Sequence, residues 1–159
     1  MRPDPIVTAQ RDGSAGSCIG KSLIARLICI VLQAMNARIE AAVDRMNIRA
    51  GDTVLEIGCG HGIAVDLICR RLRGGKIVAI DRSPKMIAAA MHRNSKHIEN
   101  GRAEFQAVDM EDFDPKGRLF DVIFALRVGI FHREPNKAQE IARRWLKPRG
   151  RLVAEYDEP

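Results

Sequence analysis

The stretch VLEIGCGHG, residues 54–62, joins an apolar run, one acidic residue and three alternating glycines. The apolar run predicts a buried strand over Thr53–Ile57. Glycine adopts backbone conformations that other residues avoid, and it lets another group come close to the backbone. This stretch therefore predicts a strand that ends in a ligand-binding loop.

Strand and helix patterns alternate along the rest of the chain. The further predicted strands are Lys76–Ile80, Ala103–Val108, Asp121–Leu126 and Arg151–Tyr156, and the predicted helices lie at 22–47, Ile63–Leu72, Ser83–Asn94 and Pro135–Leu146. Ser83-Pro84 is a strong helix start, because serine caps the first turn and proline suits its first position. Several strands are apolar on both faces, which predicts an α/β fold with a doubly wound, mostly parallel sheet.

Three polar features follow predicted strands at their carboxyl ends: the glycine loop, Asp81 and Asp109. In open parallel sheets, ligands bind outside these ends, at the point where the strand order reverses. We therefore expect the three features to meet at one edge of the sheet and to form the binding site.

Length and composition bound the kind of protein. The 159 residues suit a flexible arm over residues 1–20 and one domain over residues 21–159. The net charge of +6 permits contact with nucleic acid, but much of the excess lies near predicted helix C-termini, where cations are favourable. Aromatic residues make up only 4% of the chain, so few are present to stack on exposed bases, and nucleic acid is not the favoured partner.

The four cysteines form no C-x-x-C pair, which predicts no metal site and suits a reducing compartment. The N-terminal residues lack the pattern of a signal peptide. The most apolar window, Leu23–Met35, is too short to span a bilayer. These features predict a cytoplasmic protein without a transmembrane segment, and a membrane-surface helix at 23–35 is the alternative.

Two nucleotide ligands fit the glycine loop poorly. The dinucleotide fingerprint G-x-G-x-x-G requires glycine where Ile63 stands. The segment Ala15–Ser22 resembles a relaxed phosphate-binding loop, but such a loop follows a buried strand, and residues 11–14 are polar or glycine. We interpret Ala15–Ser22 as the end of a flexible arm at the start of a helix.

S-adenosylmethionine fits better, because it carries no phosphate. Its methionine part needs close backbone contact, which the three glycines of the loop allow. Its ribose hydroxyls need a carboxylate acceptor, which Asp81 supplies. Its adenine needs a polar edge, which Asp109 with Met110 supplies.

At these residues the chain resembles the class I, Rossmann-like S-adenosylmethionine-dependent methyltransferases, in particular bacterial enzymes of the methyltransferase 11/25 type. The similar motifs are VLEIGCGHG, VAIDRSPKMI, AVDMEDF, FDVIFALRVGIFH and RRWLKPRGRLVAE, in this order. Together they cover about residues 35–155. The resemblance implies methyl transfer from S-adenosylmethionine, with a helix that contains Asn36 capping the cofactor.

The resemblance also implies roles for individual residues. It places Glu56 near the methionine amino group, Asp81 on the ribose, Met86 beside the adenine and Asp109 at the adenine amino group. The full set of expected cofactor-binding residues is Glu56, Gly58, Cys59, Gly60, Gly62, Asp81, Arg82, Met86, Asp109, Met110, Leu126 and Arg127. If the acceptor must lose a proton, His132 and then Tyr156 are the candidate bases.

The chain departs from the family pattern in several places. Arg149 stands where glycine is usual, which suggests strain or a shifted turn, and His61 and Arg127 are less usual choices. We expect the sheet to lack the family's C-terminal antiparallel strand pair, so that the fifth strand is an exposed edge. Another chain then covers this edge, as in a homodimer formed there or through the N-terminal helix, or the domain is a shortened form with impaired activity.

Three functions remain open from the sequence. The favoured one is methyl transfer to a small-molecule or lipid-like acceptor by in-line displacement. The second is a truncated, non-catalytic protein that binds S-adenosylmethionine or docks a partner. The third is an RNA methyltransferase, although residues 125–128 lack the asparagine-proline-proline-aromatic signature.

Overall fold

The computed structural model describes residues 23–155, and contacts divide the chain into two units, residues 1–34 and 35–159. The helices are α1 (Leu23–Arg45), α2 (Ile63–Cys69), α3 (Pro84–Arg93), α4 (Ser95–Glu99), the 3₁₀ helix η1 (Met110–Asp112), α5 (Gly129–Arg133) and α6 (Pro135–Arg143). The strands are β1 (Thr53–Ile57), β2 (Lys76–Asp81), β3 (Ala103–Ala107), β4 (Phe120–Leu126) and β5 (Leu146–Glu155).

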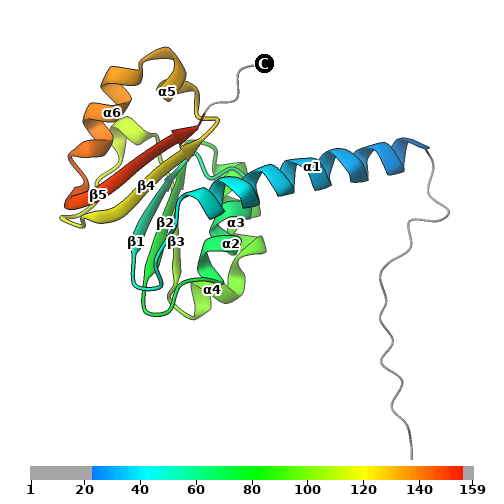
Figure 1. Ribbon diagram of the computed structural model, residues 1–159, viewed down its shortest axis with the longest axis horizontal. Coiled ribbons are helices and arrows are strands. Elements are labelled where there is room, and N and C mark those ends of the chain that lie inside the picture. Colours follow the sequence, from blue (N-terminus) through cyan, green and yellow to red (C-terminus); the bar gives the residue numbers. More distant parts are fainter. Residues whose placement is uncertain (1–22, 156–159) are drawn as a thin grey trace, which may run out of the picture. The chain divides into compact units, whose positions relative to one another are not determined.

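The five strands form one sheet in the order β3-β2-β1-β4-β5, and every pair is parallel. The strand order reverses between β1 and β4, where Leu55 lies opposite Ile123. Helices cover both faces of the sheet, with α2, α3 and α4 on one side and α5 and α6 on the other (Figure 1). The predicted doubly wound α/β fold is therefore confirmed.

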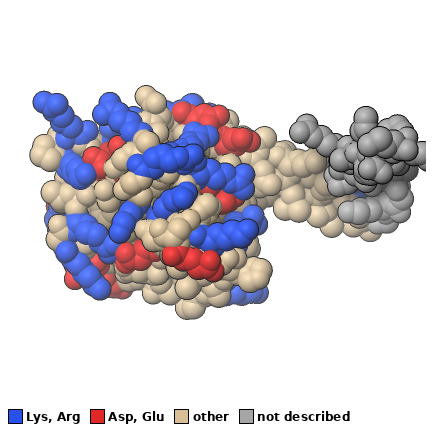
Figure 2. Space-filling view, turned by 90° about the horizontal axis from the view of Figure 1, so that it is seen from below, with Lys and Arg blue, Asp and Glu red and all other residues tan. Residues whose placement is uncertain are grey.

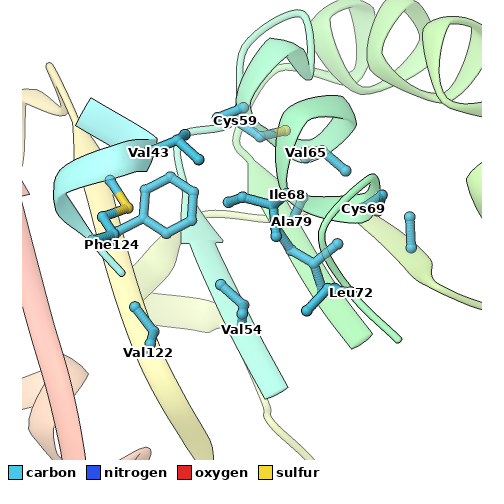
Figure 3. Packing of buried hydrophobic residues seen from close by; sticks show 14 of the residues in the cluster. Val43, Val54, Cys59, Val65, Ile68, Cys69, Leu72, Ala79, Val122 and Phe124 are labelled. Atoms are coloured by element: carbon cyan, nitrogen blue, oxygen red, sulfur yellow. The ribbon is translucent and has the colours of Figure 1, made fainter. Parts of the chain in front are cut away.

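Alternate residues of each central strand supply two hydrophobic cores. Val54 and Phe124 pack with α2, α3 and the C-terminal end of α1, as Figure 3 shows for the cluster around Ile68 and Leu72. Leu55 and its neighbours on the opposite face pack with η1, α5 and α6. Burial of both faces explains why these strands are almost continuously apolar.

Local signals set several element boundaries. β1 has the predicted bounds, and β2, β3 and β4 differ from prediction by one residue at one end. The predicted cap at the start of α3 is also confirmed, because the Ser83 hydroxyl accepts a hydrogen bond from the amide of Met86 at 3.4 Å. The short helices η1, α4 and α5 were not predicted, since each holds at most five residues.

The prediction for the last strand was wrong at its start. Residues 148–150 were expected to end a helix and precede a strand, but α6 ends at Arg143 and β5 begins at Leu146. Leu146 pairs with Phe120, and an irregularity follows before Val122 pairs with Arg151. Pairing with β4 thus extends β5 through a segment that reads locally as a turn. Arg149 does not adopt a positive φ, so the suspected strain at this position is absent.

Some predictions lie beyond the described residues. Ala15–Ser22, the boundary at residue 20 and Tyr156 belong to this group, and they stay predictions. Within residues 23–155, no helix combines the length and the hydrophobicity needed to cross a membrane. The described part of the first unit is the helical segment 23–34, and its apolar side chains are largely exposed, from Leu23 at 84% to Val31 at 50%.

Gly62→Ala is expected to lower the free energy of unfolding by about 2–4 kcal/mol. Gly62 has a φ of +70°, and an added Cβ would lie 2.6 Å from Asn94 Nδ2 and 2.9 Å from Ala90 Cβ. The left-handed conformation and the overpacking each contribute about 1–3 kcal/mol. The matched control is Gly60→Ala, which has a φ of +51° but open space around the new atom, and should cost only about 1 kcal/mol. Urea denaturation of both variants measures the difference, and equal costs would contradict it.

Candidate functional site

Two cavities lie at the carboxyl ends of the strands, beside the point where the strand order reverses. The first, here called the α1 cavity, has a volume of about 370 Å³ and is lined by residues from α1, the glycine loop and the ends of β4 and β5. The second, here called the η1 cavity, has a volume of about 450 Å³ and lies between β2, η1 and α5. Gly58 and Arg127 line both cavities, so the two adjoin at this pair of residues.

Three successive backbone amides of the glycine loop, those of residues 58–60, already donate hydrogen bonds within the chain. The amides of Gly58 and Cys59 donate to the carbonyl of Ile80 at 2.8 and 3.0 Å. The amide of Gly60 donates to the Asp81 carboxylate at 2.9 Å. A phosphate-binding loop needs such amides to point at its ligand. This loop therefore suits a ligand without phosphate, in agreement with the choice made from the sequence.

Close packing explains the first glycine of the loop. Gly58 has a φ of +72°, and a Cβ at this position would lie 2.5 Å from Val128 Cγ2. Val128 lies two residues after the end of β4, so the loops after β1 and β4 touch at Gly58. Glycine at this position therefore brings the two sides of the switch point together.

Asp81 connects the glycine loop to the η1 cavity. Its Oδ2 accepts from Gly60, and its Oδ1 accepts from the amide of Ser83 at 2.9 Å. A carboxylate has about four acceptor positions, so Asp81 retains capacity for hydroxyl donors from a ligand. Asp109 lines the same cavity, and its Oδ1 accepts from the amide of Glu111 at 3.2 Å. The predicted convergence of the glycine loop, Asp81 and Asp109 is thus confirmed.

Glu56 is a buried acid at the wall of the α1 cavity. Its side chain is only 4% exposed, and its Oε2 has no hydrogen-bond partner within the chain. Burial, and then the nearby charge of Asp81, raise the pKa of Glu56 to about 8. A buried carboxyl without a full set of partners is costly, and such groups cluster at functional sites. Glu56 is therefore placed to receive a positively charged or hydrogen-bonding group of a ligand.

The second half of α1 lines the α1 cavity with residues that sequence reasoning missed. They include Met35, Arg38, Ile39 and Arg45, whereas Asn36 does not line it. Arg45 donates to Glu155 at 2.6 Å, which links α1 to the end of β5. Arg38 and Arg45 are two helical turns apart on one face, and this spacing is the sequence signal that could have suggested them.

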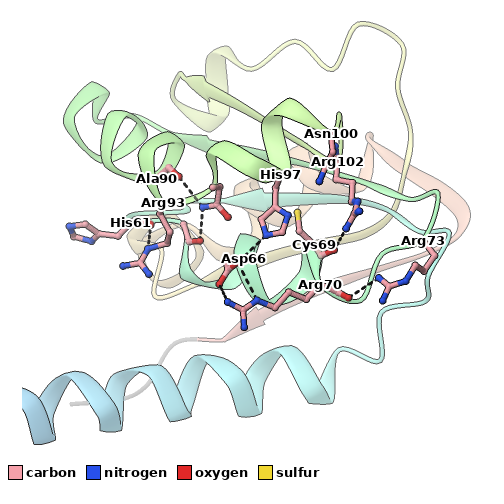
Figure 4. Close-up of polar contacts among 12 residues, drawn as sticks. His61, Asp66, Cys69, Arg70, Arg73, Ala90, Arg93, His97, Asn100 and Arg102 are labelled. Atoms are coloured by element: carbon pink, nitrogen blue, oxygen red, sulfur yellow. Dashed lines mark hydrogen bonds and ion pairs between the residues drawn. The ribbon is translucent and has the colours of Figure 1, made fainter. Parts of the chain in front are cut away.

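Neighbouring helices hold the glycine loop from outside. Asn94 is 1% exposed, and its Nδ2 donates to the carbonyl of Gly62 at 3.0 Å. Arg93 donates to the carbonyl of His61 at 3.0 Å (Figure 4). Asp66 of α2 binds both Arg70 and His97 on the same side of the domain (Figure 4). The hydrogen bonds from Arg93 and Asn94 thus hold the loop by two of its carbonyl groups.

The predicted site residues divide into three groups. Ten of them line a cavity: Glu56, Cys59, Gly60 and Leu126 in the α1 cavity, Asp81, Arg82, Asp109 and Met110 in the η1 cavity, and Gly58 and Arg127 in both. Gly62, Met86 and the exposed His132 line neither cavity. Tyr156 is outside the described residues. The geometry thus brings together most of the expected cofactor residues, and it leaves His132 outside both cavities.

Other chemistries find little support in the described part of the chain. Residues 23–155 contain no cluster of three or more His, Cys, Asp or Glu side chains that could hold a metal ion. Burial raises the pKa of Cys69 to about 12, so its thiol is not a nucleophile at neutral pH. On the face shown in Figure 2, acidic side chains interrupt the many basic ones. This face lacks the uninterrupted basic stripe that nucleic-acid binding favours.

The strand order, the glycine loop and the acids at the ends of β1 and β2 define a Rossmann-like domain of the class I methyltransferase type. A family model described as a methyltransferase domain matches residues 54–150. The chain belongs to this methyltransferase domain family.

Individual relatives agree with this placement. A ubiquinone biosynthesis O-methyltransferase of Bradyrhizobium diazoefficiens is 29% identical over 117 residues, which cover 73% of this chain and 44% of that protein. Phosphoethanolamine N-methyltransferase 1 of Zea mays is 29% identical over 117 residues, covering 72% and 22% of the two proteins. The chain therefore spans less than half of the length of these curated relatives.

Solved structures show the same fold. The structure of a geranyl diphosphate methyltransferase in complex with S-adenosylmethionine superposes with a TM-score of 0.72 at 19% identity, over 87% of this chain and 56% of that one. At this level of identity, the likeness establishes the arrangement of the elements and not the chemistry.

Proposed function

We propose that this chain binds S-adenosylmethionine across the α1 and η1 cavities and transfers its methyl group to a small-molecule acceptor. The observation that carries the proposal is the pairing of Glu56 and Asp81 on either side of a glycine loop in which the amides of residues 58–60 are already occupied. S-adenosylmethionine has a methionine zwitterion at one end, which matches Glu56. It has a pair of ribose hydroxyls at the other end, which match Asp81.

The two cavities suit the two ends of the cofactor. On the η1 side, Asp81 would accept the ribose hydroxyls, and Asp109 and the buried Met110 would contact the adenine. On the α1 side, the unpartnered Oε2 of Glu56 would take the methionine ammonium. Arg38 lines the same cavity and would take the methionine carboxylate, for which a guanidinium is well suited.

The chain's contribution to the reaction would be positioning. Bound S-adenosylmethionine supplies an activated methyl carbon, which an acceptor attacks in line with the departing sulfur. Glu56, Asp81 and the glycine loop would fix the orientation of the methyl group toward the α1 cavity. Leu126, Ile39 and Met35 line this cavity and would limit the access of water. His132 and Tyr156 remain the proposed bases for an acceptor that must lose a proton.

The relatives' names suggest the kind of acceptor. They refer to ubiquinone biosynthesis and phosphoethanolamine for two curated enzymes, and to geranyl diphosphate for a solved structure. All three names refer to small molecules. Two of them, ubiquinone and geranyl diphosphate, name molecules with an isoprenoid chain. We therefore keep a small-molecule acceptor, with a lipid-like one included, as the substrate class for this domain.

Calorimetric titration with S-adenosylmethionine and S-adenosylhomocysteine, beside NAD and ATP, tests the cofactor. We expect dissociation constants for the adenosyl ligands in the micromolar range, about −8 kcal/mol, and no measurable binding of the two phosphate-bearing ligands. Binding of NAD or ATP with equal affinity would contradict the proposal. A folded protein that binds none of the four would instead favour the non-catalytic interaction protein.

A further inference from the structure

The glycine loop is tied to both ends of α3. The amide of Gly60 donates to Asp81 Oδ2 at 2.9 Å, and Asp81 Oδ1 accepts from the amide of Ser83, the residue that caps the start of α3. At the other end of α3, Asn94 Nδ2 donates to the carbonyl of Gly62 at 3.0 Å. The loop, Asp81, α3 and Asn94 therefore form a closed ring of contacts.

Two residues at the end of α3 contact the loop, and they differ in burial. Arg93 Nε donates to the carbonyl of His61 at 3.0 Å, and this contact is exposed (Figure 4). Water can replace an exposed donor of this kind. Asn94 is only 1% exposed, so water has no access to take its place. The loop therefore depends on Asn94 more than on Arg93.

The side-chain amide of Asn94 has one defined orientation. Its Nδ2 donates to the carbonyl oxygens of Gly62 and Ala90 at 3.0 and 2.9 Å, which uses both N–H groups. The reverse orientation would place Oδ1 against these two oxygens. Oδ1 itself is buried and has no hydrogen-bond partner among the described residues. Burial of such an oxygen is costly, and an apolar side chain would avoid the cost. Retention of the amide points to a use for its two donors.

The Gly62 carbonyl lies where the glycine loop becomes α2. Gly62 has a φ of +70°, and its carbonyl also accepts the first backbone hydrogen bond of α2, from the amide of Asp66 at 3.3 Å. A Cβ on Gly62 would lie 2.6 Å from Asn94 Nδ2, so the two residues pack closely. Residues 59–61, which come directly before, line the α1 cavity. The orientation of the Gly62 peptide group therefore influences how these residues face the cavity.

We propose that Asn94 is a positioning residue for cofactor binding, which holds the glycine loop in the conformation that receives S-adenosylmethionine. Asn94 acts through the Gly62 carbonyl, because it lines neither the α1 cavity nor the η1 cavity. The assignment rests on the proposed function. A loop that is ordered before the ligand arrives loses less conformational entropy on binding, so loss of the Asn94 contact should weaken the affinity.

Two substitutions remove the contact in different ways. Asn94→Leu keeps the number and branching of the side-chain heavy atoms and loses both donors. Asn94→Ser keeps a hydroxyl that can donate to the carbonyl of Ala90, four residues earlier, but the shorter side chain does not reach Gly62. Serine is also smaller than asparagine, so Asn94→Ser remains a test if leucine disturbs the packing.

Two controls separate the loss of the contact from a general loss of stability. Ile98→Ala shortens a side chain of α4 that packs against the same hydrophobic core, and it removes no hydrogen bond to the loop. Asn100→Ser is the matched control for the change of residue type. Asn100 is exposed, its Oδ1 accepts from the amide of Arg102 at 3.3 Å, and it lines neither cavity.

Calorimetric titration measures the affinity for S-adenosylhomocysteine. Both Asn94 variants should bind it about tenfold more weakly, which corresponds to the loss of one hydrogen bond. Ile98→Ala and Asn100→Ser should stay within about threefold of wild type, because a folded domain with an intact loop keeps its affinity.

Amide hydrogen exchange of the ligand-free protein, followed by NMR, measures the opening of the loop itself. The amide of Gly60 reports on the loop, and the amide of the buried Leu55 in β1 reports on global unfolding. The rate at Gly60 relative to the rate at Leu55 should rise in both Asn94 variants. It should not rise in Ile98→Ala or Asn100→Ser.

Several results would overturn the assignment. Wild-type affinity in both Asn94 variants would do so, even with faster exchange at Gly60, because Asn94 would then be a structural contact only. An equal loss of affinity in Ile98→Ala would assign the effect to general stability. Wild-type protein that does not bind S-adenosylhomocysteine would overturn the proposed function itself, so the two failures can be told apart.

Discussion

Asp81→Asn is expected to weaken the binding of S-adenosylhomocysteine by about 100-fold. The carboxylate accepts hydrogen bonds from Gly60 and Ser83, both at 2.9 Å, and it faces the η1 cavity. An amide can keep only one of these two contacts, because its nitrogen is a donor and would face a backbone N–H. The proposed contacts with the ribose hydroxyls are lost as well, at about 1.5–3 kcal/mol for each hydrogen bond to a charged group. Calorimetric titration measures the change.

Asp114→Asn is the matched control for this experiment. Asp114 is exposed, and it accepts from the amide two residues later at 2.8 Å, as Asp81 does with Ser83. It lines neither cavity, so its replacement should leave the affinity unchanged. Equal affinities for wild type and Asp81→Asn, with the fold intact by circular dichroism, would remove Asp81 from the site.

Glu56→Gln is expected to abolish a large part of the dependence of stability on pH. The pKa of Glu56 is raised from 4.5 to about 8 in the folded protein, so the folded state binds more protons than the unfolded state between these values. The contribution of Glu56 to the free energy of unfolding is therefore most favourable at low pH, and it falls as the pH rises from about 5 to 8. The slope is about 1.4 kcal/mol for each pH unit, and the total loss is a few kcal/mol.

Urea denaturation at pH 6 and pH 9 measures this effect. Wild type should lose a few kcal/mol between the two values, and Glu56→Gln should lose much less. Glu104→Gln is the control, because Arg118 lowers the pKa of Glu104 and its contribution has the opposite sign: it is lost as the pH falls. A wild-type slope that Glu56→Gln leaves unchanged would show that Glu56 is not the group responsible.

The same variant tests the role of Glu56 in binding. In wild type, a ligand ammonium beside Glu56 favours the ionised carboxylate, so binding at pH 7 should release a proton. Calorimetry in buffers with different ionisation enthalpies measures this release. Glu56→Gln should bind S-adenosylhomocysteine about tenfold more weakly and without proton release. Proton release that persists in the variant would assign it to another group.

Local patterns predicted most of the fold and part of the site. The strands β1 to β4 could be read from apolar runs, since burial on both faces leaves few polar positions within them. The start of α3 followed from Ser83-Pro84, a signal that acts within one helical turn. The glycine loop, Asp81 and Asp109 could be placed together because parallel strands bring their carboxyl ends to one edge.

Other features depend on contacts between distant residues. Residues 146–150 belong to β5 only because β4 pairs with them, and no local property of this segment indicates a strand. His132 was a reasonable candidate base by its place after β4, yet α5 leaves it outside both cavities. The direction of the His132 side chain depends on α5, a short helix that the sequence pattern does not predict.

The amino-acid sequence by itself determined the parallel α/β fold, the edge that binds a ligand and the three features that meet there, because periodicity, capping and strand ends are local properties. Only the tertiary structure decided that the amides of Gly58, Cys59 and Gly60 are occupied, that Glu56 is buried with an unpartnered oxygen and that Arg127 has a positive φ. These properties arise where β1, β2, β4 and α1 meet. Burial, electrostatic fields and backbone strain depend on neighbours that are remote in sequence, so no local pattern contains them.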